Sequence, residues 1–204
     1  MGGSLCASTS SGTAGATMTS SPTPTSYPAV WGSDIGAADP RVAAPRVAGE
    51  RETLAAFLDW HRRTLELKCA GLTAEQLSDR AVPPSALSLR GLVRHLSGVE
   101  RWWFRMQFAG EQVPMLYYSD DDPDQDFDRL DGDFAEEVAV WRAECQRSRE
   151  IVAEATSLDD TATGFATGGP ISLRWVMLHV LADYARHNGH ADLLRERIDG
   201  RTGV

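Results

Sequence analysis

Apolar residues recur every three to four positions in four long segments of the chain, a period typical of amphipathic α-helices. The segments span residues 47–70, 89–109, 133–155 and 172–198. No segment shows the alternation of apolar and polar residues expected for a half-buried strand. The pattern therefore predicts an all-α fold, a four-helix bundle in which each helix buries one apolar face.

Residues at the segment boundaries support these helices. Ser88, Asp133 and Ser172 each precede a predicted helix, where a side-chain oxygen can accept a hydrogen bond from a free backbone N–H. Gly200 follows the last segment, where a helix commonly ends on a glycine. The predicted helices therefore have plausible beginnings and a plausible end.

The first 45 residues differ in composition from the rest of the chain. They are rich in Ser, Thr, Gly, Ala and Pro and carry almost no apolar periodicity. Such a segment cannot bury enough apolar surface to offset its ordering entropy. We therefore expect a disordered tail over residues 1–45, in which Met18 is a second possible start, and a bundle domain over residues 46–204.

Charge and cysteine content exclude several classes of protein. The net charge is −9 and Lys and Arg form no cluster, so binding to DNA or RNA is not expected. No apolar run is long enough to cross a membrane, and the first residues lack the features of a secretion signal. Three cysteines without a CxxC pair make neither a disulfide framework nor a thiolate zinc site. A cytoplasmic location is the expectation.

Several histidines interrupt the predicted apolar stripes. His61, His95 and His187 fall on these stripes, and His190 lies at the edge of one. Burial of an unpaired imidazole costs roughly 1–3 kcal/mol, and a single stripe histidine usually bonds to a carbonyl in the core. Several on different helices, together with the carboxylate of Asp183, favour a functional site.

The spacing of Asp183 and His187 favours a metal site. An i, i+4 pair leaves the same face of a helix one turn apart, and bundles build metal sites from such pairs and a ligand on a facing helix. His95, midway along the second predicted helix, is the natural third ligand. Two imidazoles and a carboxylate suit Zn²⁺ or another first-row ion such as Ni²⁺. A hydrogen-bonded polar core without metal is the alternative that spacing leaves open.

An acidic segment, residues 122–133, precedes the third predicted helix and resembles a calcium loop only in part. Aspartates occupy alternate positions from 122 to 128, but an EF-hand loop needs Gly at its sixth position and usually Glu at its twelfth. Phe127 and Asp133 stand at those places. We therefore predict a solvated acidic loop rather than a calcium site.

Adjacent aromatic residues end the second predicted helix. Trp102, Trp103 and Phe104 cannot all share one face, and we expect core packing rather than an aromatic substrate site. Glu100 and Arg101 come just before them. We expect these two residues to form ion pairs on the exposed side of the helix.

Several motifs resemble the DinB superfamily of four-helix proteins, and more narrowly its actinobacterial branch of unknown function, DUF664. They include "SLRGLVRHLSGVERWWF", "LRWVMLHVLADYARHNGHADLL", "VPPSALSL" and "YYSDDDPDQDFD", and the likeness covers roughly residues 47–200. The resemblance implies a metal on one His of the second helix and on two residues spaced i, i+4 in the fourth. These are His95, Asp183 and His187, with Asp where Glu is expected.

The same resemblance bears on two further histidines. His190 falls where many relatives carry Gln, so it is a candidate for a further ligand, a partner of a ligand or a proton carrier. His179 lies one turn before Asp183, and a trio of His95, His179 and Asp183 is the second possible ligand set.

The resemblance also implies a function. Several relatives use a low-molecular-weight thiol such as mycothiol or bacillithiol, so we expect a thiol transferase that joins a small thiol to a small electrophile. His190 or His61 would move the proton. The alternatives are a non-catalytic metal-binding or stress-associated bundle, possibly a homodimer, and a ligand-binding module without metal.

Overall fold

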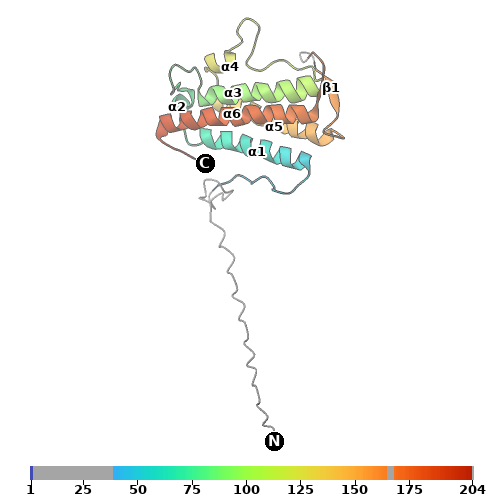
Figure 1. Ribbon diagram of the computed structural model, residues 1–204. Helices are drawn as coiled ribbons and strands as arrows, with labels where there is room; N and C mark the ends of the chain where they lie inside the picture. Colours follow the sequence, from blue (N-terminus) through green and yellow to red (C-terminus); the bar gives the residue numbers. More distant parts are fainter. Residues whose placement is uncertain (2–38, 165–167, 204) are drawn as a thin grey trace. The chain divides into compact units, whose positions relative to one another are not determined.

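The computed structural model describes Met1 and residues 39–164 and 168–203. The chain divides into two units, Met1–Asp34 and Ile35–Val204, and the described fold belongs to the second. It is mostly helical, as predicted. Four long helical segments form it: α1 (Glu50–Cys69), α3 (Leu89–Glu100) continued by the π-helical η2 (Arg101–Phe108), α5 (Phe134–Glu154) and α6 (Leu173–Asp199). In Figure 1, α6 runs between α3 and α1.

Short elements occupy the connections between these helices. They are α2 (Ala74–Ser78), α4 (Gln125–Asp128) and an antiparallel pair of strands, β1 (Thr161–Thr163) and β2 (Pro170–Ser172). The sequence pattern did not predict them, because three to five residues are too few to show a period. Helix α4 belongs to the acidic segment and packs on α3, which brings that segment to the bundle.

The predicted helix boundaries are confirmed. Ser88, Asp133 and Ser172 each accept a hydrogen bond from a backbone N–H in the first turn of α3, α5 and α6, respectively. Gly200 ends α6 with a φ of 78°, a left-handed conformation that glycine adopts without strain.

One apolar core joins the long helices. Its fully buried members include residues from α1, α3 with η2, and α6, and Trp141 of α5 is also buried. Burial of such side chains drives helix association. The fully buried residues that carry most of this core are Leu65, Leu89, Leu92, Leu96, Phe104, Leu173, Val176, Met177 and Val180.

A polar network crosses this core. Glu100 of α3 is 0% exposed, and its two carboxylate oxygens accept hydrogen bonds of 2.8 Å from Nε and Nη2 of Arg62 on α1. The hydroxyl of Tyr184 on α6 donates to the same carboxylate at 2.9 Å, and Nε1 of Trp141 on α5 donates to that hydroxyl at 2.8 Å. The network therefore takes one residue from each long helix.

The prediction that Glu100 and Arg101 lie on the exposed side was wrong. Glu100 is buried because Arg62 neutralises its charge and the hydrogen bonds satisfy its oxygens. Arg101 is half-buried and donates a hydrogen bond of 2.6 Å to the buried Glu144 of α5. Both side chains hold α3 and η2 to neighbouring helices.

Some residues ahead of the predicted domain boundary contact α1. The guanidinium of Arg41 lies over the ring of Trp60 at 4.2 Å and donates to the hydroxyl of Thr64 at 3.0 Å, and Arg41 also pairs with Asp39. Residues 2–38 lie outside the described part of the chain. The tail over residues 1–45 and the boundary at 46 therefore stay predictions.

The described helices were also checked against the dimensions of a membrane. None of the helices in residues 39–164 and 168–203 combines the length and the apolar character that a transmembrane span requires.

Loss of the Glu100 carboxylate should destabilise the fold strongly. Glu100→Ala leaves the Arg62 charge buried without a partner, so we expect the free energy of unfolding to fall by about 3–5 kcal/mol. Tyr184→Phe removes the hydrogen bond to Glu100 and the acceptor of the Trp141 Nε1–H, and it should cost about 1–3 kcal/mol. Urea unfolding followed by circular dichroism measures both.

The matched control is Glu150→Ala, which removes an exposed glutamate that pairs with Arg147 on the surface of α5. Its unfolding midpoint should stay at the wild-type value, because exposed ion pairs contribute little. Equal midpoints for Glu100→Ala and Glu150→Ala would contradict the role of the network.

Candidate metal centre

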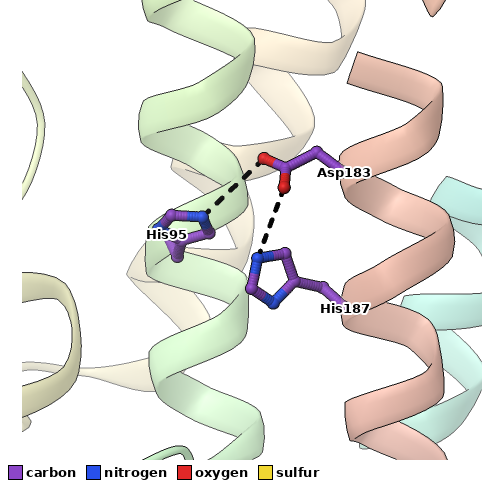
Figure 2. A group of neighbouring side chains, drawn as sticks. All are labelled: His95, Asp183 and His187. Carbon is purple, nitrogen blue, oxygen red and sulfur yellow. Dashed lines mark ion pairs between the residues drawn. The ribbon is translucent and has the colours of Figure 1, made fainter. Parts of the chain in front are cut away.

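Three potential metal ligands converge between α3 and α6. His95 projects from the middle of α3, and Asp183 and His187 project from α6 one turn apart (Figure 2). Nε2 of His95 lies 3.8 Å from Oδ2 of Asp183, and Nε2 of His187 lies 3.5 Å from Oδ1 of Asp183. The i, i+4 spacing thus places both α6 side chains opposite the histidine of α3, as the sequence predicted.

These separations suit a small divalent ion. One ligand atom from each of the three residues lies within 4.8 Å of the others. Ligands at about 2.0–2.2 Å from a tetrahedral zinc ion lie roughly 3.4 Å apart, so two of the contacts are nearly right and the two histidines would have to approach. The arrangement is compatible with a divalent metal site that has three protein ligands.

The protonation of the two histidines differs. Burial tends to lower the pKa of His95, but its hydrogen bond to Asp126 and the nearby carboxylate of Asp183 outweigh burial and raise it to about 9. Burial, followed by the nearby charge of His95, lowers the pKa of His187 to about 4. His187 is therefore neutral at physiological pH and has a lone pair for an ion. His95 would have to release a proton first.

The carboxylate of Asp183 stays ionised between the two rings. Burial tends to raise its pKa, but the nearby rings of His95 and His187 lower it overall. An anionic oxygen between two imidazoles is the donor set that first-row divalent ions accept.

Asp126 of α4 completes the surroundings of His95. Its Oδ2 lies 2.8 Å from Nδ1 of His95, the ring nitrogen that points away from Asp183. Arg94 holds this part of α4 by donating to the carbonyls of Gln125 at 2.8 Å and Asp126 at 3.1 Å, while it also donates to Glu137 of α5 at 2.6 Å. A carboxylate on the far nitrogen fixes the orientation of a histidine ligand and increases its basicity.

Asp126 was not predicted as a site residue. The aspartates from 122 to 128 were expected to form a solvated group, but the Asp126 side chain is only 13% exposed. Asp122 pairs with Arg129 and Asp128 with Arg80, each at 2.6 Å. The described residues therefore give no support to the calcium alternative.

Gly91 lets the acidic segment lie close to α3. A Cβ atom at this position would come within 2.6 Å of Cδ1 of Phe127. The Phe127 ring stacks on His95 with 5.4 Å between ring centroids. The close approach that Gly91 permits thus keeps both Phe127 and the neighbouring Asp126 against the ligand histidine.

The remaining candidate histidines take different positions. Nδ1 of His190 lies 3.3 Å from Nδ1 of His187, at the edge of the centre. His61 of α1 contacts Asn188 instead. The side-chain amide nitrogen of Asn188 lies 3.1 Å from Nδ1 of His61 and donates to the backbone carbonyl of His61 at 3.0 Å. His179 stacks on Trp175 and lies tilted against Trp103, and it is not part of the three-residue cluster found among the described residues.

A cavity adjoins the centre on the side of the acidic segment. It has a volume of about 640 Å³ and lies between α3 with η2 and residues 115–127, and His95 and Asp126 form part of its wall. Most of the other lining side chains are aromatic or aliphatic. They include Val99, Trp102, Trp103, Met115, Tyr117 and Phe127.

A family model described as mycothiol-S-transferase matches residues 53–200. The chain belongs to this family. The match begins within α1 and includes the other three long helices, the acidic segment and the cluster of His95, Asp183 and His187. Membership of the mycothiol-S-transferase family suggests transfer of a small-molecule thiol, and it confirms the DinB-like resemblance drawn from the sequence motifs.

The chain also resembles a solved structure. This crystal structure, described as a conserved protein from Enterococcus faecalis, is 13% identical, and the alignment covers 76% of this chain and 100% of that chain with a TM-score of 0.52. Such a likeness shows the fold alone. Among curated proteins, no significant match to the chain is found.

Asp126→Asn should lower the pKa of His95. The substitution removes the negatively charged acceptor that favours the protonated ring, so the pKa should move from about 9 toward the ordinary value of 6.5. An NMR titration of the histidine Cε1 protons in chelator-treated protein measures this change.

Asp128→Asn is the control, because Asp128 lies on the same short helix and pairs with Arg80 rather than with His95. The His95 titration should be unchanged in this variant. If both variants titrate like the wild type, Asp126 does not act on His95.

Proposed function

We propose that this chain is a divalent-metal-dependent thiol S-transferase that joins mycothiol, or a similar small thiol, to a small electrophile. The observation that supports this proposal most directly is the cluster of His95, Asp183 and His187 in a chain of the mycothiol-S-transferase family. Two imidazoles and a carboxylate would hold Zn²⁺, Ni²⁺ or a related ion. With three protein ligands, a coordination position is left for a substrate.

The nucleophilic sulfur comes from a substrate rather than from the described cysteines. Cys69 and Cys145 are buried, and burial raises the pKa of the Cys69 thiol to about 12 and that of Cys145 as well. Neither thiol forms a reactive thiolate at neutral pH. A bound divalent ion would supply that chemistry by coordinating the substrate sulfur and lowering its pKa.

The reaction balances as a substitution at carbon. The substrate thiol loses its proton, and its sulfur forms a bond to the electrophilic carbon. The bond between that carbon and its leaving group breaks, and the leaving group departs with the electron pair. The protein's residues hold the two substrates together and accept the proton.

His190 is the favoured proton acceptor. It is half-buried, and its Nδ1 lies 3.3 Å from the ring of the ligand His187, so it stands beside the place where the proton is released. His61 is the second candidate. Its contact with Asn188, one residue beyond His187, brings it near the centre but engages its Nδ1.

Chelation should reveal the metal. Removal of a bound ion leaves Asp183 and two histidines facing one another, so a chelator should lower the melting temperature of the wild type. We expect His95→Ala or His187→Ala to abolish this response and Asp183→Ala to weaken it. Thermal unfolding with and without chelator, together with metal analysis of protein purified without a His tag, makes the measurement.

His179→Ala is the matched control, because His179 lies one turn from Asp183 but belongs to the stack with Trp103 and Trp175. It should keep the wild-type chelator response. A response that persists in His95→Ala and disappears in His179→Ala would assign the ligands to the other trio.

Thiol binding tests the function itself. Cobalt-substituted protein should develop a sulfur-to-metal charge-transfer band when titrated with mycothiol, and His95→Ala should lose it. Cysteine and bacillithiol serve as comparison thiols, and monochlorobimane then serves as the electrophile. If no thiol perturbs the cobalt spectrum at millimolar concentration, the chain is a non-catalytic metal-binding bundle.

The proton acceptor is tested in the same assay. His190→Gln should lower turnover with the cobalt–thiol band intact, whereas His61→Gln should leave turnover near the wild-type rate. The opposite pattern would give the role to His61, and full activity of both variants would show that the proton leaves to water.

A further inference from the structure

The cavity beside His95 has the size and the walls of a small-molecule site. Its volume of about 640 Å³ falls within the range of roughly 300–1,000 Å³ common for ligand pockets. Trp102 and Trp103 of η2 line one side, and Tyr117 and Phe127 line the other. All four are half-buried, so their rings are held by the fold while part of each surface faces the cavity. Such walls favour a flat, apolar occupant.

The one arginine in the cavity wall is already engaged. Arg94 donates to Glu137 at 2.6 Å and to two backbone carbonyls of the acidic segment, and its guanidinium lies 4.0 Å from the ring centroid of Tyr117. Its three donor nitrogens are used by these partners, and Glu137 is shared with Arg90. The other basic group in the wall, His95, bonds to Asp126 and faces Asp183. An anionic ligand therefore finds no basic group without a partner in this wall.

The rim of the cavity is acidic. Asp120 and Asp124 are exposed and line it, beside the exposed Tyr118. Two carboxylates at the entrance repel an anion and attract a cation, while an uncharged ligand is affected little. The rim thus selects by charge, and the walls select by shape.

The position of the cavity links it to the candidate metal centre. His95 belongs to the cavity wall through one part of its ring and to the ligand cluster through Nε2. A molecule in the cavity therefore lies against one of the three residues that would hold the ion.

We infer that this cavity binds the electrophilic co-substrate, and that this co-substrate is a flat, largely apolar molecule that is uncharged or cationic. The role of this ligand as the electrophile rests on the proposed function. The shape and charge of the ligand rest on the cavity itself.

Three matched naphthalenes test the charge preference without any reaction. They are 2-naphthylmethylamine, which is cationic at neutral pH, the uncharged 2-naphthalenemethanol and the anionic 2-naphthoate. Isothermal titration of the full chain with chelator present, so that no metal ion coordinates the carboxylate or the amine of a probe, should give a dissociation constant about tenfold lower for the cation than for the anion. This ratio corresponds to about 1.4 kcal/mol. Equal affinities for cation and anion, or no binding at millimolar concentration, would overturn the inference.

Paired variants locate the effect. The double variant Asp120→Asn, Asp124→Asn should reduce the preference for the cation to less than about twofold, because the two rim carboxylates produce that preference. Asp121→Asn with Asp131→Asn removes two exposed carboxylates that do not line the cavity, so this control should keep the wild-type ratio. The same ratio in both double variants would contradict the proposed rim.

A wall variant shows that the probes occupy the cavity. Trp102→Leu should weaken all three probes by a similar factor, since it removes ring surface and no charge. If circular dichroism shows that Trp102→Leu does not fold, Tyr118→Ala replaces it, because Tyr118 is 43% exposed at the rim and packs little. Unchanged affinity in the folded variant would place the probes elsewhere.

The failure of this inference can be told from the failure of the proposed function. Naphthalene binding needs no thiol, whereas the cobalt spectrum needs no naphthalene. In turnover with monochlorobimane, 2-naphthylmethylamine should inhibit competitively against the bimane and not against the thiol. Competition against the thiol would overturn the assignment of the cavity to the electrophile, even if naphthalene binding and the cobalt–thiol spectrum were as expected.

Discussion

The carboxylate of Glu100 lies where the four long helices meet, and its partners set how those helices align. Arg62 reaches it from α1 and Tyr184 from α6, and Trp141 of α5 holds the Tyr184 hydroxyl. Removal of either charge would strand the other in the core, so the helices cannot slide past one another at low cost. Asp183 directly precedes Tyr184, and the ligand histidine of α3 lies five residues before Glu100. The contact that fixes the core therefore also brings the candidate ligands face to face.

A second buried carboxylate joins α3 to α5. Glu137 of α5 accepts hydrogen bonds from Arg90 and Arg94, and Arg94 in turn holds the backbone of α4. The acidic segment is thus fastened to the bundle by hydrogen bonds from Arg94 to its carbonyls, and these leave the Asp126 carboxylate to bond to the ring of His95. Charged residues, satisfied in pairs, position both the ligands and their supports.

The sequence was informative where the relevant contacts are local. Helices of twenty residues show a period, Ser88 and Ser172 cap the turns that follow them, and Asp183 and His187 are related by one helical turn. Their meeting with His95 followed from the geometry of bundles and from family resemblance. Glu100 was misplaced because its partner Arg62 lies 38 positions away, and Asp126 was missed because its contact with His95 spans 31 positions. No local pattern distinguishes one aspartate of an acidic run from the next.

The segment from Tyr117 to Asp128 serves two purposes at once. It forms one side of the cavity, and it supplies the carboxylate that bonds to His95. An insertion or substitution that reshapes the cavity also moves this carboxylate, and the tight fit of Phe127 against Gly91 transmits even small backbone shifts. The shape of the cavity and the basicity of His95 are therefore mechanically coupled through one stretch of backbone. Only side chains on the exposed rim can change without moving the backbone beneath them.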